Sequence, residues 1–335
     1  MREVEAAETS PEVQDNVDFV RFPDGMTEPA AGDASERLAA ILRQAPGMQL
    51  LYDRLEEPGD RELLARVLAF RVLGHRRVQL PMTGARLRDL VDRARAARTQ
   101  ADTAPLGIFD WQADDYDLRV LGHPIDLRAY VGNVVQTFQL EQYLCPGALE
   151  VGVRPGDVVI DGGACFGDTA LYFAERAGPG GRVVAFEFEP ANLALLEHNL
   201  SINPELAARV EPRRAALWDR AGEHIGFQAL GPATVADPDE AGTVPTETID
   251  SLVEGGVLER VDFLKLDVEG SELRALRGAE TALRRFRPRL AIAAYHRLDD
   301  LAVLPAYLDA LGCGYRFRLA HTTMHAEETM LFAAA

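Results

Sequence analysis

The sequence predicts an α/β fold, with a largely parallel sheet in the C-terminal half and a mainly helical region before it. After Val153, apolar segments of strand length alternate with segments of helical periodicity. The first of these strands runs into a glycine-rich turn and then a helix (DGGACFGDTA, residues 161–170). The last two apolar segments are joined by the short connection 321–328, which indicates an antiparallel pair at one edge of the sheet.

Seven segments of this half have the composition of strands. They are residues 158–161, 183–187, 210–215, 263–268, 290–295, 315–319 and 329–333. Helices are expected to begin near Asp168, Asn192, Thr248 and Glu272, and another is expected over 301–311. For the second of these, Asn192 is a candidate N-cap.

The N-terminal half is predicted to contain two regions. Residues 1–34 are rich in Glu, Pro, Asp and Ala with little periodicity, which is typical of a disordered tail. Residues 35–145 show helical spacing up to position 98, with Thr83 as a helix N-cap, then short strands over 106–127 and a helix over 134–143. The third region, 146–335, begins at a Pro-Gly pair and contains the sheet.

The composition limits the binding partners and the cellular location that we expect for this protein. The 335 residues carry 53 acidic and 35 basic side chains, a net charge of −18, which disfavours nucleic acid as a partner. Three widely separated cysteines predict neither a disulfide framework nor a zinc site. Because the N-terminus lacks a signal peptide and no run could span a membrane, we expect a soluble cytoplasmic protein.

The glycine-rich turn is the strongest indication of a ligand. Gly162, Gly163 and Gly167 remove side chains where a ligand approaches or where φ is positive. A dinucleotide site would have G-x-G-x-x-G, but Ala164 occupies the position of the second glycine. The carboxylate of Asp161 would repel a diphosphate, and it suits a ligand with an amino group and a cation, such as S-adenosylmethionine.

The next two strand ends supply candidates for the rest of such a ligand. Glu187, at the end of the second strand, is suited to accept hydrogen bonds from ribose hydroxyls, with Glu189 as the alternative. After the third strand, small residues such as Ala216 would admit a base. Leu217 or Trp218 could pack on its face, although a tryptophan there is as often part of the core.

The fourth and fifth strands bring polar side chains to the same edge. Lys265 and Asp267 share one face of the fourth strand, where a charge is costly unless it is paired or functional. They therefore form a buried pair, a ligand site, or both. Glu269 follows the fourth strand and His296 follows the fifth.

Histidines are the candidates for proton transfer, because imidazole titrates near neutral pH. His296 is the first candidate, and His321 and His325 in the last connection are alternates. The spacing of His321 and His325 would suit a metal on a helix, but a hairpin connection is expected there. Asp267, Glu269 and His296 could instead hold Mg²⁺, which would activate a hydroxyl; we favour the metal-free route.

Three motifs, in order, resemble the FkbM family of S-adenosylmethionine-dependent methyltransferases. They are DGGACFGDTALYFA, VVAFEFEPANLALLEHNL and DFLKLDVEGSELRAL, with ETIDSL before the third. The resemblance runs from about Val153 to Ala333. Upstream, YDRL, AFRVLG, VQLP and FQLEQYL are similar to longer FkbM-type proteins of carbohydrate and natural-product gene clusters. The resemblance implies a Rossmann-like class I methyltransferase sheet, ordered 3-2-1-4-5-7-6 with strand 7 antiparallel.

The resemblance also implies roles for individual residues. Asp161, Gly163 and Gly167 would hold the methionine part of the donor, Glu187 the ribose, and Asp267 would lie near the sulfonium. The FEFEP run departs from the commoner Phe-Glu-Pro, so Glu189 stays an alternative. The complete predicted donor set is Asp161, Gly162, Gly163, Gly167, Asp168, Thr169, Glu187, Ala216, Trp218 and Asp267.

The predicted function is transfer of a methyl group from S-adenosylmethionine to a hydroxyl of a sugar or glycosylated natural product. His296, Asp267, His321 and His325 are the predicted catalytic residues. Residues 35–98 and the helix near 138–143 are expected to cover the acceptor or form a homodimer contact. The alternatives are a Mg²⁺-dependent version, a non-catalytic S-adenosylmethionine-binding protein, and an NAD-linked oxidoreductase, which Asp161 and Ala164 disfavour.

Overall fold

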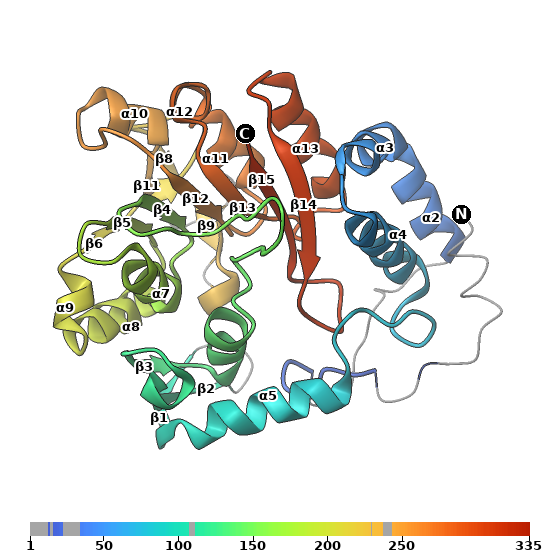
Figure 1. Cartoon of the computed structure of the whole chain (residues 1–335). Coiled ribbons are helices and arrows are strands. Elements are labelled where there is room, and N and C mark those ends of the chain that lie inside the picture. Colours follow the sequence, from blue (N-terminus) through green and yellow to red (C-terminus); the bar gives the residue numbers. More distant parts are fainter. Residues whose placement is uncertain (1–12, 14–15, 23–33, 107–110, 229, 237–242) are drawn as a thin grey trace.

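A computed structural model describes residues 13, 16–22, 34–106, 111–228, 230–236 and 243–335 of the chain. Seven strands form its main sheet in the spatial order β14-β15-β13-β12-β4-β5-β6 (Figure 1). Neighbouring strands are parallel except that β15 runs antiparallel to both β13 and β14. This confirms the predicted order 3-2-1-4-5-7-6. The strands are β4 (Val158–Gly162), β5 (Arg182–Phe186), β6 (Val210–Arg213), β12 (Phe263–Leu266), β13 (Arg289–Ala293), β14 (Arg316–His321) and β15 (Thr329–Ala334).

Helices cover both faces of the sheet, because successive side chains of each strand point to opposite faces. Val159 packs into the core on one face and Ile160 into the core on the other. The first face is covered by α7 (Asp168–Ala177), α8 (Pro190–Ser201) and α9 (Pro204–Ala207). The second is covered by α10 (Ile249–Glu254), α11 (Glu272–Arg277), α12 (Glu280–Phe286) and α13 (Asp300–Ala310).

The first helices of the chain extend the second core. They are α2 (Ala34–Arg43), α3 (Ala45–Arg54) and α4 (Pro58–Leu73), and they lie beside α13 and β14 (Figure 1). Leu51, Leu55 and Leu64 are buried in that core. The apolar faces of these three helices are therefore occupied by contacts with α13, β14 and one another.

The region after α4 connects the helices to the sheet. As predicted, Thr83 caps α5 (Gly84–Ala96), accepting a hydrogen bond from the N–H of Arg86. A small antiparallel sheet follows, made of β1 (Arg98–Pro105), β2 (Gln112–Asp117) and β3 (Asp126–Ala129). Within the region 106–127, where short strands were expected, residues 118–121 instead form a 3₁₀ turn, η1 (Leu118–Leu121). Asp117 caps it by accepting a hydrogen bond from the N–H of Arg119. Residues 107–110 of the first predicted strand lie outside the described residues.

Two other predictions shift at their boundaries. The helix expected over 134–143 is a short α6 (Val131–Asn133) followed by a π-helix, η2 (Val134–Gln139), so 142 and 143 lie beyond it. The strand expected over 210–215 ends at Arg213 as β6, and a separate strand of a small second sheet, β7 (Ala216–Leu217), follows it. The remaining short elements are β8 (His224–Ile225), β9 (Phe227–Gln228), η3 (Gly231–Ala233), β10 (Val235–Ala236) and β11 (Val244–Glu247). None of the helices described is both long and apolar enough to cross a membrane.

Candidate active site

Two adjoining cavities open where β4, β12 and β13 end. Open α/β sheets bind ligands at this carboxyl edge. The larger cavity has a volume of about 400 Å³. Four residues line both cavities, namely Gly163 and Cys165 after β4 and Asp267 and Glu269 after β12. A molecule bound in one cavity would therefore meet a molecule bound in the other at these residues.

The glycines of the first turn have different roles. Gly163 has φ of +80°, and a Cβ there would lie 1.9 Å from the carbonyl oxygen of Asp267. Only glycine therefore allows the two strand ends to approach each other and leave the cavities open. Gly167, with φ of +79°, precedes the first residue of α7. Gly162 lines neither cavity, because it packs against Leu217 and Leu266.

The structure changes the role of Asp161. Its buried carboxylate lies 3.1 Å from the ammonium nitrogen of Lys265 and accepts a hydrogen bond from the hydroxyl of Thr169 at 2.7 Å. Asp161 lines neither cavity. Its contacts with Lys265 and Thr169 instead hold the glycine-rich turn from the buried side of the sheet. Burial lowers the pKa of Lys265, but the carboxylates of Asp161 and Asp267 outweigh burial and raise it. Lys265 is thus a cation in the wall of the larger cavity. Its ion-pair partner is Asp161, whereas the sequence suggested Asp267.

The structure also distinguishes Glu187 from Glu189. Glu187 lines the smaller cavity and accepts hydrogen bonds from the N–H groups of Phe188 and Glu189 at 2.7 and 2.8 Å. Burial raises the pKa of Glu187 to about 7. The Glu189 carboxylate accepts from the N–H of Asn192 at 2.7 Å, so Glu189 is the N-cap of α8 and Asn192 is not. Of the two acids, Glu187 faces the cavity.

Of the residues predicted to bind the base after the third strand, some line the smaller cavity and one does not. Ala216 and Leu217 line the smaller cavity, together with Ala215. Trp218 lines neither cavity; it is buried beside Ile225, and the guanidinium of Arg274 lies 4.6 Å from its ring centroid. Trp218 therefore lies in a buried cluster outside both cavities, whereas Ala216 lies where the sequence predicted it.

Asp267 lies at the junction of the two cavities, where two phenols and an imidazole surround it. The hydroxyl of Tyr143 donates to its carboxylate at 2.8 Å, and that of Tyr295 donates at 3.1 Å. The Nε2 atom of His296 lies 3.4 Å from the same carboxylate. Burial raises the pKa of both tyrosines well above its usual range, so both remain hydrogen-bond donors to Asp267.

His296 lies among three carboxylates. Its Nδ1 atom is 2.8 Å from Glu272, and its Nε2 atom is 3.3 Å from Glu269 in addition to Asp267. Burial lowers the pKa of His296, but Glu272 and Glu269 outweigh burial and raise it well above its usual range. A histidine that is already protonated cannot accept a proton, so the structure argues against His296 as the base.

The same residues include a possible metal site. One ligand atom each from Asp267, Glu272 and His296 lies within 4.8 Å of the other two. Glu272 takes the place that the sequence suggested for Glu269, because its fully buried carboxylate lies nearer the imidazole. One imidazole and two carboxylates suit a transition ion such as Mn²⁺ or Zn²⁺ better than Mg²⁺.

His321 does not take part in the site. It is buried between Thr329 and Thr323, whose hydroxyl oxygens lie 2.8 and 3.2 Å from its Nδ1 and Nε2 atoms. Burial lowers the pKa of His321 to about 3, and His321 lines neither cavity. Its side chain thus lies within the hairpin, away from both cavities in which the other predicted residues gather.

His325 lines the larger cavity, but both of its ring nitrogens are engaged. Nδ1 accepts a hydrogen bond from the N–H of Glu327 at 3.3 Å. Nε2 lies 3.4 Å from the carboxylate of Asp18. No lone pair of His325 is therefore available to a hydroxyl in the cavity.

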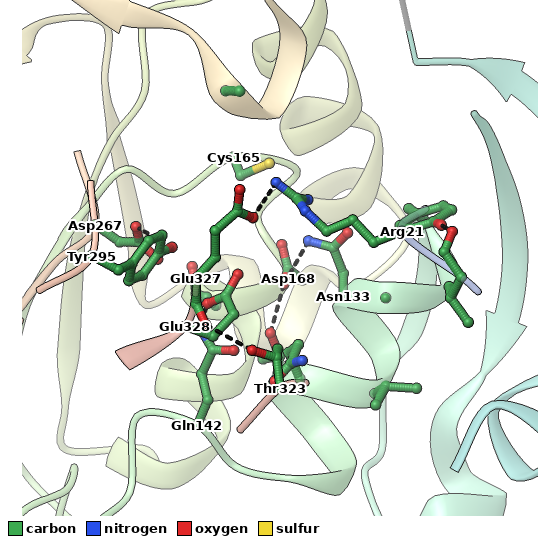
Figure 2. Close-up of a pocket in the computed structure, with 18 of the residues that line it drawn as sticks. Arg21, Asn133, Gln142, Cys165, Asp168, Asp267, Tyr295, Thr323, Glu327 and Glu328 are labelled. Carbon is green, nitrogen blue, oxygen red and sulfur yellow. Dashed lines mark hydrogen bonds and ion pairs between the residues drawn. The ribbon is translucent and has the colours of Figure 1, made fainter. Parts of the chain in front are cut away.

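Part of the predicted disordered tail belongs to the cavity wall. Residues 16–22 pack there, while 1–12, 14–15 and 23–33 lie outside the described residues. Asp18 accepts hydrogen bonds from the N–H groups of Val20 and Arg21, and the hydroxyl of Tyr130 donates to the carbonyl of Val20 at 2.6 Å. Figure 2 shows Arg21 reaching Glu327, at 2.5 Å. The sequence signal for this segment is VDFVRF (residues 17–22), an apolar run within a polar tail.

The aromatic residues beside this segment were also missed from the sequence. The rings of Trp111 and Tyr130 are stacked, with centroids 4.3 Å apart and planes 4° from parallel. Both line the larger cavity. Asp168 lines it too, held by the hydroxyl of Thr137 at 2.8 Å and the amide of Asn133 at 3.3 Å. Thr137 lies in the π-helix η2, an irregularity that is frequent at functional sites.

Within the described part of the chain, several buried acceptor atoms in the wall of the larger cavity have no hydrogen-bond partner. They are Oδ1 of Asp168, Oε1 of Gln136 and Oε1 of Gln142. Leaving such atoms unpaired costs about 1–3 kcal/mol each. All three are acceptors, so the cavity favours a ligand that supplies several hydrogen-bond donors.

Comparison with known proteins identifies the domain. Residues 161–317 match the model of the Methyltransferase FkbM domain. The chain carries an FkbM methyltransferase domain. This confirms the resemblance found in the sequence, and a methyltransferase domain of this family implies S-adenosylmethionine as its donor.

Solved structures support the fold. The chain resembles the crystal structure of methyltransferase FkbM from Methylobacillus flagellatus KT, with a TM-score of 0.55 and 21% identity. The similarity covers 88% of this chain and 60% of that one, so our chain spans only part of the length of its structural relative. No curated protein matches the chain significantly.

Two more distant similarities are to S-adenosylmethionine-bound fibrillarin from Aeropyrum pernix and to an O-methyltransferase from Bacillus cereus. The fibrillarin match has a TM-score of 0.39 and 17% identity, and it covers 58% of this chain and 74% of that one. The O-methyltransferase match has a TM-score of 0.36 and 15% identity, and it covers 61% and 80%.

Proposed function

We propose that this protein transfers a methyl group from S-adenosylmethionine to a hydroxyl of a sugar or a glycosylated small molecule. The observation that carries the proposal is the pair of cavities that meet at Asp267, inside an FkbM methyltransferase domain. The smaller cavity would hold the adenosine part of the donor, and the larger one the acceptor. Methyl transfer is an in-line displacement, so holding two molecules end to end supplies much of the rate.

The residues of the smaller cavity fit the donor. Glu187 is a buried carboxylate, and the contact of its second oxygen with Asn192 is long, at 3.4 Å, which leaves that oxygen to accept from ribose hydroxyls. Ala215 and Ala216 leave room for the base beside Leu217. When bound, S-adenosylmethionine supplies an electrophilic methyl group on a cationic sulfur. Asp267 provides negative charge at the junction, and Asp161 contributes indirectly by holding Lys265.

The larger cavity favours a polyhydroxylated acceptor. It combines the stacked rings of Trp111 and Tyr130 with carboxylates and amides. An apolar acceptor would leave the buried oxygens of Asp168, Gln136 and Gln142 unpaired, whereas sugar hydroxyls would donate to them. These features support a sugar or glycoside and do not identify which one.

Methyl-transfer assays with radiolabelled S-adenosylmethionine over a set of glycosides test this function, with calorimetry of S-adenosylhomocysteine and NAD beside them. We expect micromolar binding of S-adenosylhomocysteine, no binding of NAD, and methylation of at least one glycoside. Binding of NAD alone would support an oxidoreductase instead. Binding of S-adenosylhomocysteine without turnover on any acceptor would support a non-catalytic binding protein.

A metal-assisted form of the reaction is a second candidate, favoured by the cluster of Asp267, Glu272 and His296. In that form the ion would replace the proton on His296 and lower the pKa of the acceptor hydroxyl. Activity that disappears in EDTA and returns with Mn²⁺ or Mg²⁺ would establish it. Activity that is unchanged in EDTA would exclude it.

A further inference from the structure

The reaction proposed above needs a group that takes the proton of the acceptor hydroxyl. The histidines are poorly suited to it, because His296 lies among carboxylates that raise its pKa and His321 and His325 have both ring nitrogens engaged. The carboxylates of the larger cavity are the remaining candidates. They are Asp18, Asp168, Asp267, Glu269, Glu327 and Glu328.

Five of these six are held by two or more donors or by a cation. Asp18 accepts from two backbone N–H groups and lies beside His325, and Asp168 accepts from Thr137 and Asn133. Asp267 accepts from two phenols, Glu269 pairs with His296, and Glu327 pairs with Arg21. In the part of the chain that the structure describes, the carboxylate of Glu328 accepts one hydrogen bond, from the amide of Gln142 at 3.2 Å.

We propose that Glu328 is the proton acceptor of the reaction, a role that rests on the proposed function. Its free oxygen faces the cavity, and in the view of Figure 2 its side chain lies between Asp267 and Asp168. As the acceptor oxygen bonds to the methyl carbon, the carbon–sulfur bond breaks and its electron pair stays on sulfur. The hydroxyl proton passes to Glu328, which later returns it to solvent.

The backbone supports a dedicated role for this position. Glu328 has φ of +66°, in the left-handed region that non-glycine residues rarely adopt. Of the six described non-glycine residues with positive φ, three line this cavity, namely Cys165, Glu269 and Glu328. Such strained conformations are concentrated at functional sites. Glu328 directly precedes β15, and its side chain lines the cavity in this conformation.

The surroundings of Glu328 also suit proton transfer. Burial and the nearby carboxylates of Asp267 and Glu327 raise its pKa, while Arg21 and His325 lower it, and the resulting pKa is about 7. The phenols of Tyr143 and Tyr295, which donate to Asp267, are close enough for Glu328 to raise their pKa as well. A general base works best when its pKa lies near the operating pH.

The test is Glu328→Gln, which keeps the size of the side chain and removes the proton acceptor. We expect kcat to fall by roughly 10²- to 10⁴-fold, while the Kd of S-adenosylhomocysteine stays within about threefold of wild type. The limb of the wild-type pH profile near pH 7 should disappear, and Glu328→Asp should recover part of kcat. Glu205→Gln, exposed on α9 outside the cavity, is the matched control.

Three results would overturn the inference. A kcat of Glu328→Gln within threefold of wild type, with the limb near pH 7 retained, would remove Glu328 from the reaction and leave the proposed function intact. A parallel loss of S-adenosylhomocysteine binding would show that Glu328 supports the structure of the site instead. A wild-type protein that binds S-adenosylhomocysteine and methylates no glycoside would overturn the proposed function, and this role with it.

Discussion

The two cavities of this protein are built in different ways. The smaller one is formed by main chain and side chains at the ends of neighbouring strands of the main sheet, with Gly163 after β4, Glu187 after β5 and Asp267 after β12. The larger one is assembled from segments far apart in the sequence, chiefly 16–22, 111–143 and 323–328. The shape of the smaller cavity therefore depends on local backbone conformation. The shape of the larger cavity depends on contacts between side chains that come together only when the chain folds.

If this contrast is right, substitutions in the first cavity should alter donor binding and those in the second should alter the acceptor reaction. The largest effect is expected for Gly163→Ala. The new Cβ would overlap the carbonyl oxygen of Asp267, and alanine tolerates φ of +80° poorly. We expect the affinity for S-adenosylhomocysteine, measured by calorimetry, to fall about 100-fold or more, equivalent to roughly 3 kcal/mol.

Gly256→Ala is the matched control for Gly163→Ala. Gly256 has φ of +72°, but a Cβ there meets nothing within 4 Å. It carries the same backbone strain without the overlap, so it should cost about 1–2 kcal/mol of stability and leave donor binding unchanged. Equal losses of affinity in the two variants would mean that strain, and not the close approach of β4 and β12, limits binding.

Glu187→Gln should separate donor binding from stability. Burial raises the pKa of Glu187 from 4.5 to about 7, so folding favours the protonated form. Its contribution to stability is fully present below about pH 4.5 and is lost as the pH rises through 7. The variant should therefore be more stable than wild type at pH 8, by up to about 3 kcal/mol, with the difference disappearing near pH 4.

In the same variant, donor affinity should fall about tenfold, because a neutral amide accepts hydrogen bonds from a diol less strongly than a carboxylate does. Chemical denaturation at several pH values and calorimetry measure the two effects. Glu189→Gln is the control: it weakens the cap of α8, so its stability should decrease. A Glu187→Gln protein that is less stable at pH 8 would contradict the assignment of a buried, unfavourable charge.

The smallest effect is expected for Arg21→Met, in the second cavity. Methionine keeps much of the length of the side chain but leaves Glu327 without its cation. We expect the KM for the acceptor to rise roughly threefold to tenfold, about 1 kcal/mol, with the affinity for S-adenosylhomocysteine unchanged. Arg43→Met, exposed at the end of α2, serves as the control. A change in donor affinity would show that the two cavities are not independent.

The sequence predicted the first cavity better than the second for a physical reason. A strand, a glycine turn and a helix are adjacent in the chain, so their pattern identifies Gly163 and Glu187 directly. The segment 16–22 looked like part of a disordered tail because its contacts with Tyr130 and Glu327 join distant positions. The stacking of Trp111 on Tyr130 is equally invisible to a local pattern.

The sequence alone determined the order of elements, the topology of the sheet and the glycine turn with which the ligand site begins. Periodicity and turn chemistry are local properties, and the family motifs record them. Only the tertiary structure decided the surroundings of the charged residues: Asp161 pairs with Lys265, neighbouring carboxylates raise the pKa of His296, and Glu328 lines the cavity with one hydrogen bond, from Gln142. The protonation of a side chain depends on burial and on neighbours in space, and these are set when the chain folds.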